Sequence, residues 1–204
     1  MLDIQKHGCV ENDCIEKNLI INPFLVMENL HQLLVNRRST RRYTNEPIDP
    51  ESVKLILEAA LLAPTSKSSR PWQFVVVEDK EMLQRLSECK PAGAGPIAKA
   101  SLAIVVAADP TLSDPWVEDA SIAAAFMQLQ AEDLGLGSCW IQVRGRFASD
   151  GTPSEEWVQE LLGIPDTLPV VCIITLGHKD EERKPVDTAK LLWEKVHIGT
   201  WKEM

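Results

Sequence analysis

Two apolar runs constrain most strongly what this chain can fold into. Leu102–Ala108 contains no polar residue, and Val170–Leu176 contains only Thr175. Runs of this length and composition are typical of strands that are buried on both faces. Such strands cannot lie on the surface of a domain, so we expect a sheet with helices packed against both of its faces.

Helical periodicity and capping residues account for most of the chain around these strands. Asp49 and Asp79 are good N-caps, and Gly135 and Gly163 are good helix stops. The pattern predicts helices over 24–36, 50–63, 80–89, 118–134, from the capping box Thr152-Pro153-Ser154-Glu155 to Gly163, and over 187–196, with further strands at Gln73–Glu78 and Ser138–Val143. The alternation of strands and helices favours an α/β or α+β sandwich.

The length and the charge limit the domain count and the class of partner. At 204 residues the chain can bury one substantial core, and we assign residues 24–204 to one domain. Residues 1–23 form an irregular N-terminal extension to which no role is assigned. The formal net charge of −9 argues against nucleic acid as the main partner, because such a partner needs a basic surface.

Cysteine usage and hydropathy indicate a cytoplasmic protein with no membrane partner. No segment approaches the ~18 uninterrupted apolar residues that cross a bilayer, and the first seven residues lack the apolar run of a secretory signal. The five cysteines, Cys9, Cys14, Cys89, Cys139 and Cys172, are odd in number and scattered, as in a reduced protein. Cys9 and Cys14 supply two of the four ligands that a zinc or iron–sulfur site needs, so no metal site is expected.

The strongest chemical signal is the run Arg37-Arg38-Ser39-Thr40-Arg41-Arg42 at the end of a predicted helix. Guanidinium groups bind phosphate through paired, charge-assisted hydrogen bonds, and hydroxyl groups complete such a site. In an acidic chain, a local group of four arginines is better explained as a small-anion site than as a nucleic-acid surface. A solvated basic turn is equally compatible with these residues taken alone.

Two further segments carry information mainly in combination with this run. Pro64-Thr65-Ser66-Lys67-Ser68-Ser69-Arg70-Pro71-Trp72 is a hydroxyl-rich loop whose donors suit a heteroaromatic ring edge or a polyol, although most such loops are only connections. Leu134-Gly135-Leu136-Gly137-Ser138-Cys139-Trp140-Ile141-Gln142 contains glycines that let the backbone approach a ligand or another element. A helix stop followed by a buried strand explains this last segment equally well.

Together, these three segments resemble the nitroreductase family. Residues 37–43 resemble the flavin-phosphate motif that opens the family's domain, and residues 64–72 resemble its Pro-Ser-x-x-Asn-x-Gln-Pro-Trp loop. Residues 119–124 and 134–141 resemble its core helix and the strand beside the flavin ring. The order and the spacing of the segments agree from about Leu30 to the C-terminus.

The resemblance implies an α+β fold, a three-layer α/β/α sandwich with a mostly antiparallel central sheet, in an intertwined homodimer that binds FMN at two inter-subunit sites. By matching position, Arg37, Arg38 and Ser39 would bind the FMN phosphate and ribityl chain, and Arg41 would lie near the pyrimidine edge of the ring. Pro64, Thr65, Ser66 and Ser68 would approach the same flavin from the partner subunit. Trp140, Ile141 and Gln142 would lie along the ring near N5, and Arg183 or Lys184 would close the phosphate site.

The chain departs from the family's loop pattern at two positions. Ser68 stands where the family usually has Asn, and Arg70 stands where it has Gln. We therefore expect the contacts to the ring edge to differ from those usual in the family.

The activity implied by the resemblance is that of an FMN-dependent oxidoreductase. Such an enzyme takes hydride from NADH or NADPH and reduces an electron-poor acceptor, such as a nitroaromatic or a quinone, by a ping-pong mechanism. The cofactor carries the hydride, so no catalytic side chain is assigned. Two alternatives stay open: a flavin enzyme of the same scaffold with different chemistry, such as a flavin-consuming or dehydrogenating oxidase, and a non-enzymatic FMN- or anion-binding module.

The remaining candidate residues favour structural roles. His31 and His197 are isolated, and the thiol of Cys139 is inert unless its pKa is lowered. Trp116, Trp157, Trp193 and Trp201 are expected to pack in the core or at an interface, and Arg144 and Arg146 are candidates for contact with the phosphates of a nicotinamide cofactor.

Overall fold

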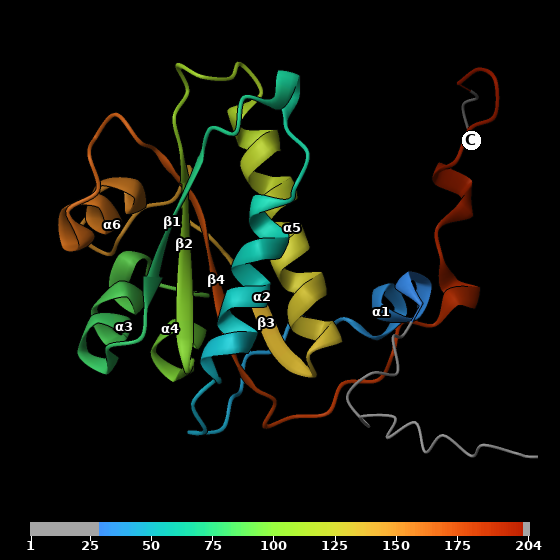
Figure 1. Cartoon of the computed structure of the whole chain (residues 1–204), viewed down its shortest axis with the longest axis horizontal. Helices are drawn as coiled ribbons and strands as arrows, with labels where there is room; N and C mark the ends of the chain where they lie inside the picture. Colours follow the sequence, from blue (N-terminus) through green and yellow to red (C-terminus); the bar gives the residue numbers. More distant parts are fainter. Residues whose placement is uncertain (1–28, 202–204) are drawn as a thin grey trace, which may run out of the picture.

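The computed structural model of the chain describes residues 29–201, and a four-stranded antiparallel sheet forms its centre (Figure 1). Strands β1 (Trp72–Val77), β2 (Leu102–Ala108), β4 (Val170–His178) and β3 (Leu136–Gln142) lie side by side in that order, and each neighbouring pair is antiparallel. The edge strands of this sheet are therefore β1 and β3. Because all neighbouring strands are antiparallel, the fold is α+β and not α/β.

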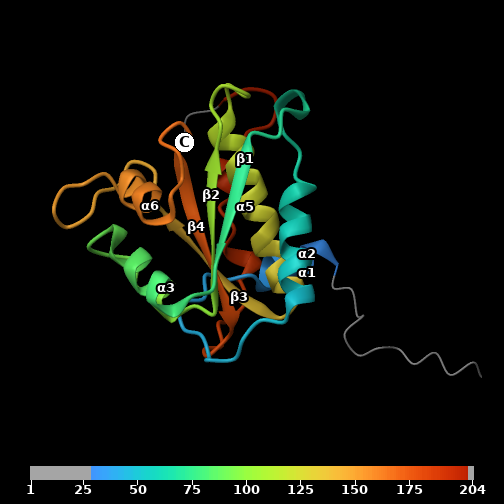
Figure 2. The ribbon, with the colours of Figure 1, turned by 60° about the vertical axis from the view of Figure 1, so that its left-hand side comes forward.

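Helices cover both faces of the sheet (Figure 2). One face carries α2 (Pro50–Leu61) and α5 (Trp116–Asp133), and the other carries α3 (Lys80–Leu86), α4 (Pro96–Lys99) and α6 (Ser154–Leu162). Strand β2 serves both layers, because Ile104 packs into the core beneath α2 and α5 whereas Val105 packs into the core beneath α3, α4 and α6. Every residue of β2 is buried, which confirms the predicted burial on both faces.

Four of the predicted helix boundaries are confirmed at their capping residues. The side chains of Asp49 and Asp79 accept hydrogen bonds from the main-chain N–H groups of Ser52 and Met82. Gly135 and Gly163 follow α5 and α6 with φ angles of +74° and +66°, a backbone region that favours glycine. The helix predicted to end at Cys89 ends at Leu86 and continues as a 3₁₀ turn through Cys89.

Two helices begin later in the described residues than the sequence predicts. Helix α1 spans only Leu30–Asn36, since Asn29 adopts an extended conformation and its side chain accepts from Gln32 N–H; residues 24–28 of the predicted helix lie outside the described residues. The predicted capping box does not form, and α6 begins at Ser154. The Ser154 hydroxyl donates to the Cys89 carbonyl, and the Glu155 carboxylate accepts from Gly145 N–H.

The helix predicted over 187–196 is also wrong, because two 3₁₀ turns, Thr188–Lys190 and Trp193–Lys195, take its place. Leu192 and Trp193 are exposed, so residues 29–201 offer this segment no surface on which to bury an apolar helical stripe. A helix of about ten residues without such packing is marginal in water. Figure 1 shows the segment passing α1 and running away from the sheet.

The remaining structural expectations are met in part. Trp116 and Trp157 pack against the two core clusters, whereas Trp193 and Trp201 are exposed. The expected extension over residues 1–23, with its two cysteines, lies outside the described residues. Between residues 29 and 201, every helix is too short or too polar to cross a membrane.

Candidate functional site

The arginine-rich segment, residues 37–43, lies against the ends of β3 and β4. Ser39 forms a parallel bridge with Ser138, and Thr40 N–H donates to the Ser138 carbonyl at 2.9 Å. Tyr43 forms an antiparallel bridge with Lys179, which directly follows β4. The segment is therefore fixed to the sheet by backbone pairing at both of its ends.

Two glycines make this close approach possible. Gly137 of β3 and Gly177 of β4 are partners in the register of the sheet. A Cβ atom on Gly137 would lie 2.6 Å from Cγ2 of Thr40, and one on Gly177 would lie 2.8 Å from Cδ1 of Tyr43. Gly137 thus allows another protein segment to approach β3 closely. This is one of the two roles predicted for the glycines of residues 134–142.

Tyr43 locks the segment from within. Its hydroxyl donates to the Thr40 carbonyl at 2.6 Å and lies 2.7 Å from Oγ1 of Thr175. Burial raises the pKa of Tyr43 well above its usual value, so the phenol keeps its proton at neutral pH. The buried hydroxyl is a permanent donor that holds the turn after Ser39 in place.

The arginines of the segment lie near a cavity and near strand β3. Arg38 and Thr40 line a cavity of about 610 Å³ between the arginine-rich segment and the segment that follows β4. Burial raises the pKa of the Cys139 thiol of β3, and the positive charges of Arg41 and Arg37 lower it. The segment thus brings positive charge both to the cavity and to the neighbouring part of β3.

Lys90 adds a further cation beside β3. Its ammonium group donates to the Gln142 carbonyl at 3.0 Å, at the end of the strand. Burial lowers the pKa of Lys90, and the positive charge of Arg146 lowers it further. The positive charges of Arg41, Lys90 and Arg37 all lower the pKa of Cys139, which lies in this edge strand.

The edge of β3 turns main-chain groups toward this positive charge. The carbonyl groups of Ser138 and Gln142 point away from β4, because they accept from Thr40 N–H and from Lys90. Main-chain groups of alternate strand residues point to the same side, so the N–H of Trp140 also faces this edge. The edge therefore offers a main-chain donor between Ser39 and Lys90.

The side chains of the predicted ring-contact residues lie on different faces of the sheet. Trp140 packs against the core beneath α2 and α5, and its Nε1–H donates to Oε1 of Gln142 at 2.9 Å. Nε2 of Gln142 in turn donates to the Arg144 carbonyl at 2.9 Å. Ile141 is buried in the opposite core, so a ligand on the Trp140 face can reach only its main chain.

The predicted hydroxyl-rich loop is strained and firmly anchored. Lys67, Ser68 and Arg70 have φ angles of 50°, 56° and 51°, which non-glycine residues rarely adopt. The buried carboxylate of Asp119 accepts from Ser66 N–H at 2.8 Å and from the Ser113 hydroxyl at 2.6 Å. Strain of roughly 1–3 kcal/mol per residue persists only where the surrounding structure imposes it, and it clusters at functional sites.

This loop and the arginine-rich segment lie at opposite ends and opposite edges of the sheet. The loop, including Pro64 and Thr65, leads into Trp72, which starts edge strand β1 and pairs with Ala108. The segment meets the other edge strand, at the end of the sheet where β2 begins. The seven residues of β2 separate the two ends by roughly 20 Å. Within one chain, the two halves of the predicted site are therefore apart.

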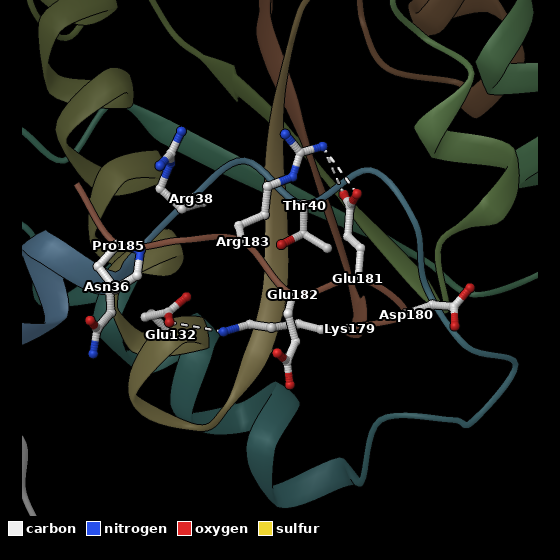
Figure 3. A pocket seen from close by; sticks show the side chains of 10 residues that line it. All are labelled: Asn36, Arg38, Thr40, Glu132, Lys179, Asp180, Glu181, Glu182, Arg183 and Pro185. Atoms are coloured by element: carbon white, nitrogen blue, oxygen red, sulfur yellow. Dashed lines mark hydrogen bonds and ion pairs between the residues drawn. The ribbon is translucent and has the colours of Figure 1, made fainter. Parts of the chain in front are cut away.

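The late basic residues do lie next to the arginine-rich segment, as predicted. An Nη1–H group of Arg38 donates to the main-chain carbonyl of Lys184 at 2.7 Å. Arg183 lines the same cavity as Arg38, where its guanidinium binds the carboxylate of Glu181 (Figure 3). Arg183 thus supplies a guanidinium group to the cavity, whereas the contact of Lys184 is made by its backbone.

Three residues in these contacts were not singled out from the sequence. Lys90 follows Cys89 in an irregular segment and had no local signal. Asp119 fell inside a motif that was matched only as a core helix, although a carboxylate in the first turn of a helix is a common anchor for a loop. Glu181 precedes the basic pair Arg183 and Lys184 closely, and an acidic residue carries no sequence signal for an anion site.

Fold and site together define a class: an α+β protein with an arginine-rich segment paired to an edge strand of its sheet. The model of the nitroreductase family matches residues 34–178, and the chain belongs to this family. An FMN-dependent nitroreductase of Clostridium difficile has a similar structure, with a TM-score of 0.81 and 46% identity over 83% of this chain and 98% of that chain.

Two further relatives support the assignment. A protein of Archaeoglobus fulgidus, provisionally described as an NADH dehydrogenase/NAD(P)H nitroreductase, is 40% identical over 164 residues, which cover 77% of this chain and 89% of the relative. The NADPH:FMN oxidoreductase of Vibrio harveyi, solved in complex with NAD⁺, has a TM-score of 0.73 and 25% identity over 87% of this chain and 80% of that chain. These similarities confirm the family and the α+β fold that the sequence motifs predicted.

Proposed function

We propose that this protein is an FMN-dependent oxidoreductase that uses NADH or NADPH as the hydride donor. The observation that carries the proposal is the group of cations at the edge of β3. The positive charges of Arg37 and Arg41 act on Cys139 of β3, and Lys90 donates to the Gln142 carbonyl of the same strand from the loop after α3. The named relatives act on flavins and nicotinamide cofactors, which agrees with this arrangement.

The residues present fit the group that the family binds. Gly137 leaves room for Thr40 to lie against β3, and this places Ser39 and Arg37 at the strand edge. In the proposed site, Arg37, Arg38 and Ser39 hold the phosphate and ribityl chain, and Arg183 closes the phosphate site. A dianion bound among guanidinium and hydroxyl groups gains several charge-assisted hydrogen bonds.

The other end of the edge suits the flavin ring. Trp140 and Gln142 contribute main-chain groups and a fixed side-chain amide, Ile141 contributes only its backbone, and Arg41 serves the pyrimidine edge. These residues would hold FMN, which when bound would supply the redox chemistry between a nicotinamide donor and an electron-poor acceptor, such as a nitroaromatic or a quinone, in a ping-pong cycle. The cations beside the strand stabilise negative charge on a bound ligand without transferring a proton.

A dimer completes the proposed site. The loop containing Pro64, Thr65, Ser66 and Ser68 lies too far from Arg37 in its own chain, so we propose that it serves the site of the partner subunit. The strained backbone of this loop and its anchor, Asp119, keep its donors in a fixed arrangement. Residues after β4 expose apolar side chains, with Trp193 69% and Ile198 90% exposed. Exposed apolar side chains that are grouped in this way are typical of protein interfaces.

A receiving surface for these side chains is present on the same chain. A groove of about 440 Å³ is lined by Leu30 and Leu33 of α1, Ala59 of α2 and Phe126 of α5. A second copy of the chain supplies both the apolar segment and the groove, so two identical contacts form at once. We propose a cytoplasmic homodimer.

We expect the purified protein to have twice the 22.7 kDa mass of the chain at working concentrations, since interfaces that exchange segments are large and obligate. Light scattering coupled to size exclusion measures this mass directly. Replacing Ile198 with Ser removes an exposed apolar group and should increase the monomer fraction. A monomer that retains full flavin occupancy would contradict the assignment of the loop to the partner's site.

Spectroscopy under anaerobic conditions tests the proposed activity. The protein is expected to bind FMN, to lose its visible flavin absorption on addition of NADH or NADPH, and to recover it when a nitroaromatic or quinone acceptor is added. A protein that binds FMN but resists reduction would instead be a binding module. Reduction without turnover of any added acceptor would favour different chemistry on the same scaffold.

A further inference from the structure

The cavity beneath the arginine-rich segment contains more acid than base (Figure 3). Its charged lining residues are the cations Arg38, Lys179 and Arg183 and the carboxylates Glu132, Asp180, Glu181 and Glu182. Three positive charges face four negative ones, so the lining carries a formal charge of −1. The cavity contains the basic residues expected at the phosphate, but its carboxylates offset their positive charge.

Glu181 accepts hydrogen bonds from two donors that could otherwise bind an anion, the Arg41 amide and the Arg183 guanidinium group. One of its oxygens accepts from Arg41 N–H at 3.0 Å, and both of its oxygens accept from Nη2 of Arg183, at 3.1 and 3.0 Å. Its side chain is only 16% exposed. The hydrogen bond from the Arg41 amide and the positive charge of Arg183 lower the pKa of Glu181, although slight burial opposes them, so the group is ionised at neutral pH.

The neighbouring cations are already engaged by other groups. Lys179 binds Glu132 at 2.8 Å, and Arg38 donates to the Lys184 carbonyl at 2.7 Å. Arg183 is held mainly by Glu181, and the two side chains point toward each other above Thr40 in Figure 3. The availability of Arg183 to a ligand is therefore governed by this one carboxylate.

We propose that Glu181 competes with the phosphate of the cofactor for Arg183 and thereby sets how strongly the site prefers FMN to a flavin without phosphate. The proposal rests on the proposed function, in which Arg183 closes the phosphate site. A phosphate and the Glu181 carboxylate cannot share the same guanidinium group closely, because both are negatively charged. Binding of the phosphate then requires that Glu181 release Arg183, and the affinity for FMN is lowered accordingly.

The variant Glu181→Gln removes the negative charge of the side chain but keeps its size and shape. The glutamine keeps an oxygen that can accept from Arg41 N–H, so the backbone of the segment stays held while the competing negative charge is removed. We expect the Kd for FMN to fall about tenfold, the scale of one charge-assisted hydrogen bond, and the Kd for riboflavin to change less than about twofold. Fluorescence quenching of each flavin during titration measures both constants.

Glu182→Gln is the matched control. It removes the same charge from the same cavity, but the Glu182 carboxylate is directed away from Arg183 in Figure 3. We expect this variant to bind FMN within about twofold of the unmodified protein, because an exposed charge is strongly screened by salt. The double variant Glu181→Gln/Arg183→Gln should lose the gain in FMN affinity, since the freed donor is then absent.

Titration with inorganic phosphate alone separates this proposal from the proposed function. Tighter phosphate binding by Glu181→Gln than by the unmodified protein supports competition even if neither protein binds flavin, a result that would overturn only the flavin assignment. Unchanged or weaker binding of both FMN and phosphate by Glu181→Gln overturns the competition. If Glu181→Gln and Glu181→Ala both fail to fold by circular dichroism, the carboxylate is structural and the proposal is likewise overturned.

Discussion

Replacing Gly137 with alanine is expected to detach the arginine-rich segment from the sheet and to abolish most flavin binding. The added Cβ would lie 2.6 Å from Cγ2 and 2.8 Å from Cβ of Thr40, distances that side chains do not tolerate. Forcing an extra methyl group into such a contact costs about 1–3 kcal/mol. The clash is relieved only if Thr40 moves away from β3. This movement breaks the hydrogen bond from Thr40 N–H to the Ser138 carbonyl, which places Ser39 and Arg37.

Urea denaturation and FMN titration measure the two consequences separately. Gly95→Ala is the matched control, because an added Cβ at that position meets no atom within 4 Å and its φ angle is ordinary. Adding Thr40→Gly to Gly137→Ala should restore much of the stability, since it removes the whole clashing side chain, including the Cβ atom at 2.8 Å. If Gly137→Ala binds FMN and unfolds as the unmodified protein does, the contact between the segment and β3 is not what organises the site.

The fold could be predicted from the sequence largely because its signals are local. The buried strand at Leu102–Ala108 has no polar residue, and its burial requires two helical layers whatever the rest of the chain does. Asp49 and Gly163 act within a single turn of helix, so their effects need no knowledge of distant contacts. The segment after residue 186 could not be predicted in this way, because its apolar residues find no partner surface within the described part of their own chain.

The candidate site could be predicted as a set of segments but not as an arrangement. The arginine-rich run and the neighbouring basic pair were recognised by composition, and Arg38 does meet the backbone of Lys184. The position of the run against β3 depends on the bridge of Ser39 to Ser138, which no local pattern specifies. The contacts of Lys90 with the Gln142 carbonyl and of Glu181 with Arg41 N–H were missed for the same reason, because each joins residues more than 50 positions apart in the sequence.

Replacing Arg37 with alanine is expected to weaken FMN binding by about 1.5–3 kcal/mol, the range for hydrogen bonds to charged groups, which is roughly 10- to 150-fold in Kd. Riboflavin, which lacks the phosphate, should bind almost as before. Arg37 is a cleaner test than Arg38, because Arg38 also donates to the Lys184 carbonyl and its loss would disturb the protein itself. Parallel titrations with the two flavins at fixed ionic strength measure the difference.

Arg42→Ala is the matched control for this prediction. Arg42 belongs to the same run and carries the same charge, but it is exposed and forms a surface ion pair with Asp180 at 3.7 Å. Such a pair contributes little to stability, and Arg42 has no assigned contact to the cofactor, so FMN binding should change by less than about 1 kcal/mol. Equal losses for FMN and riboflavin in Arg37→Ala would mean that Arg37 acts on the fold. Equal losses of FMN affinity in Arg37→Ala and Arg42→Ala would mean that only the overall charge of the run attracts the anion. A specific contact to the phosphate would instead make the loss larger for Arg37→Ala.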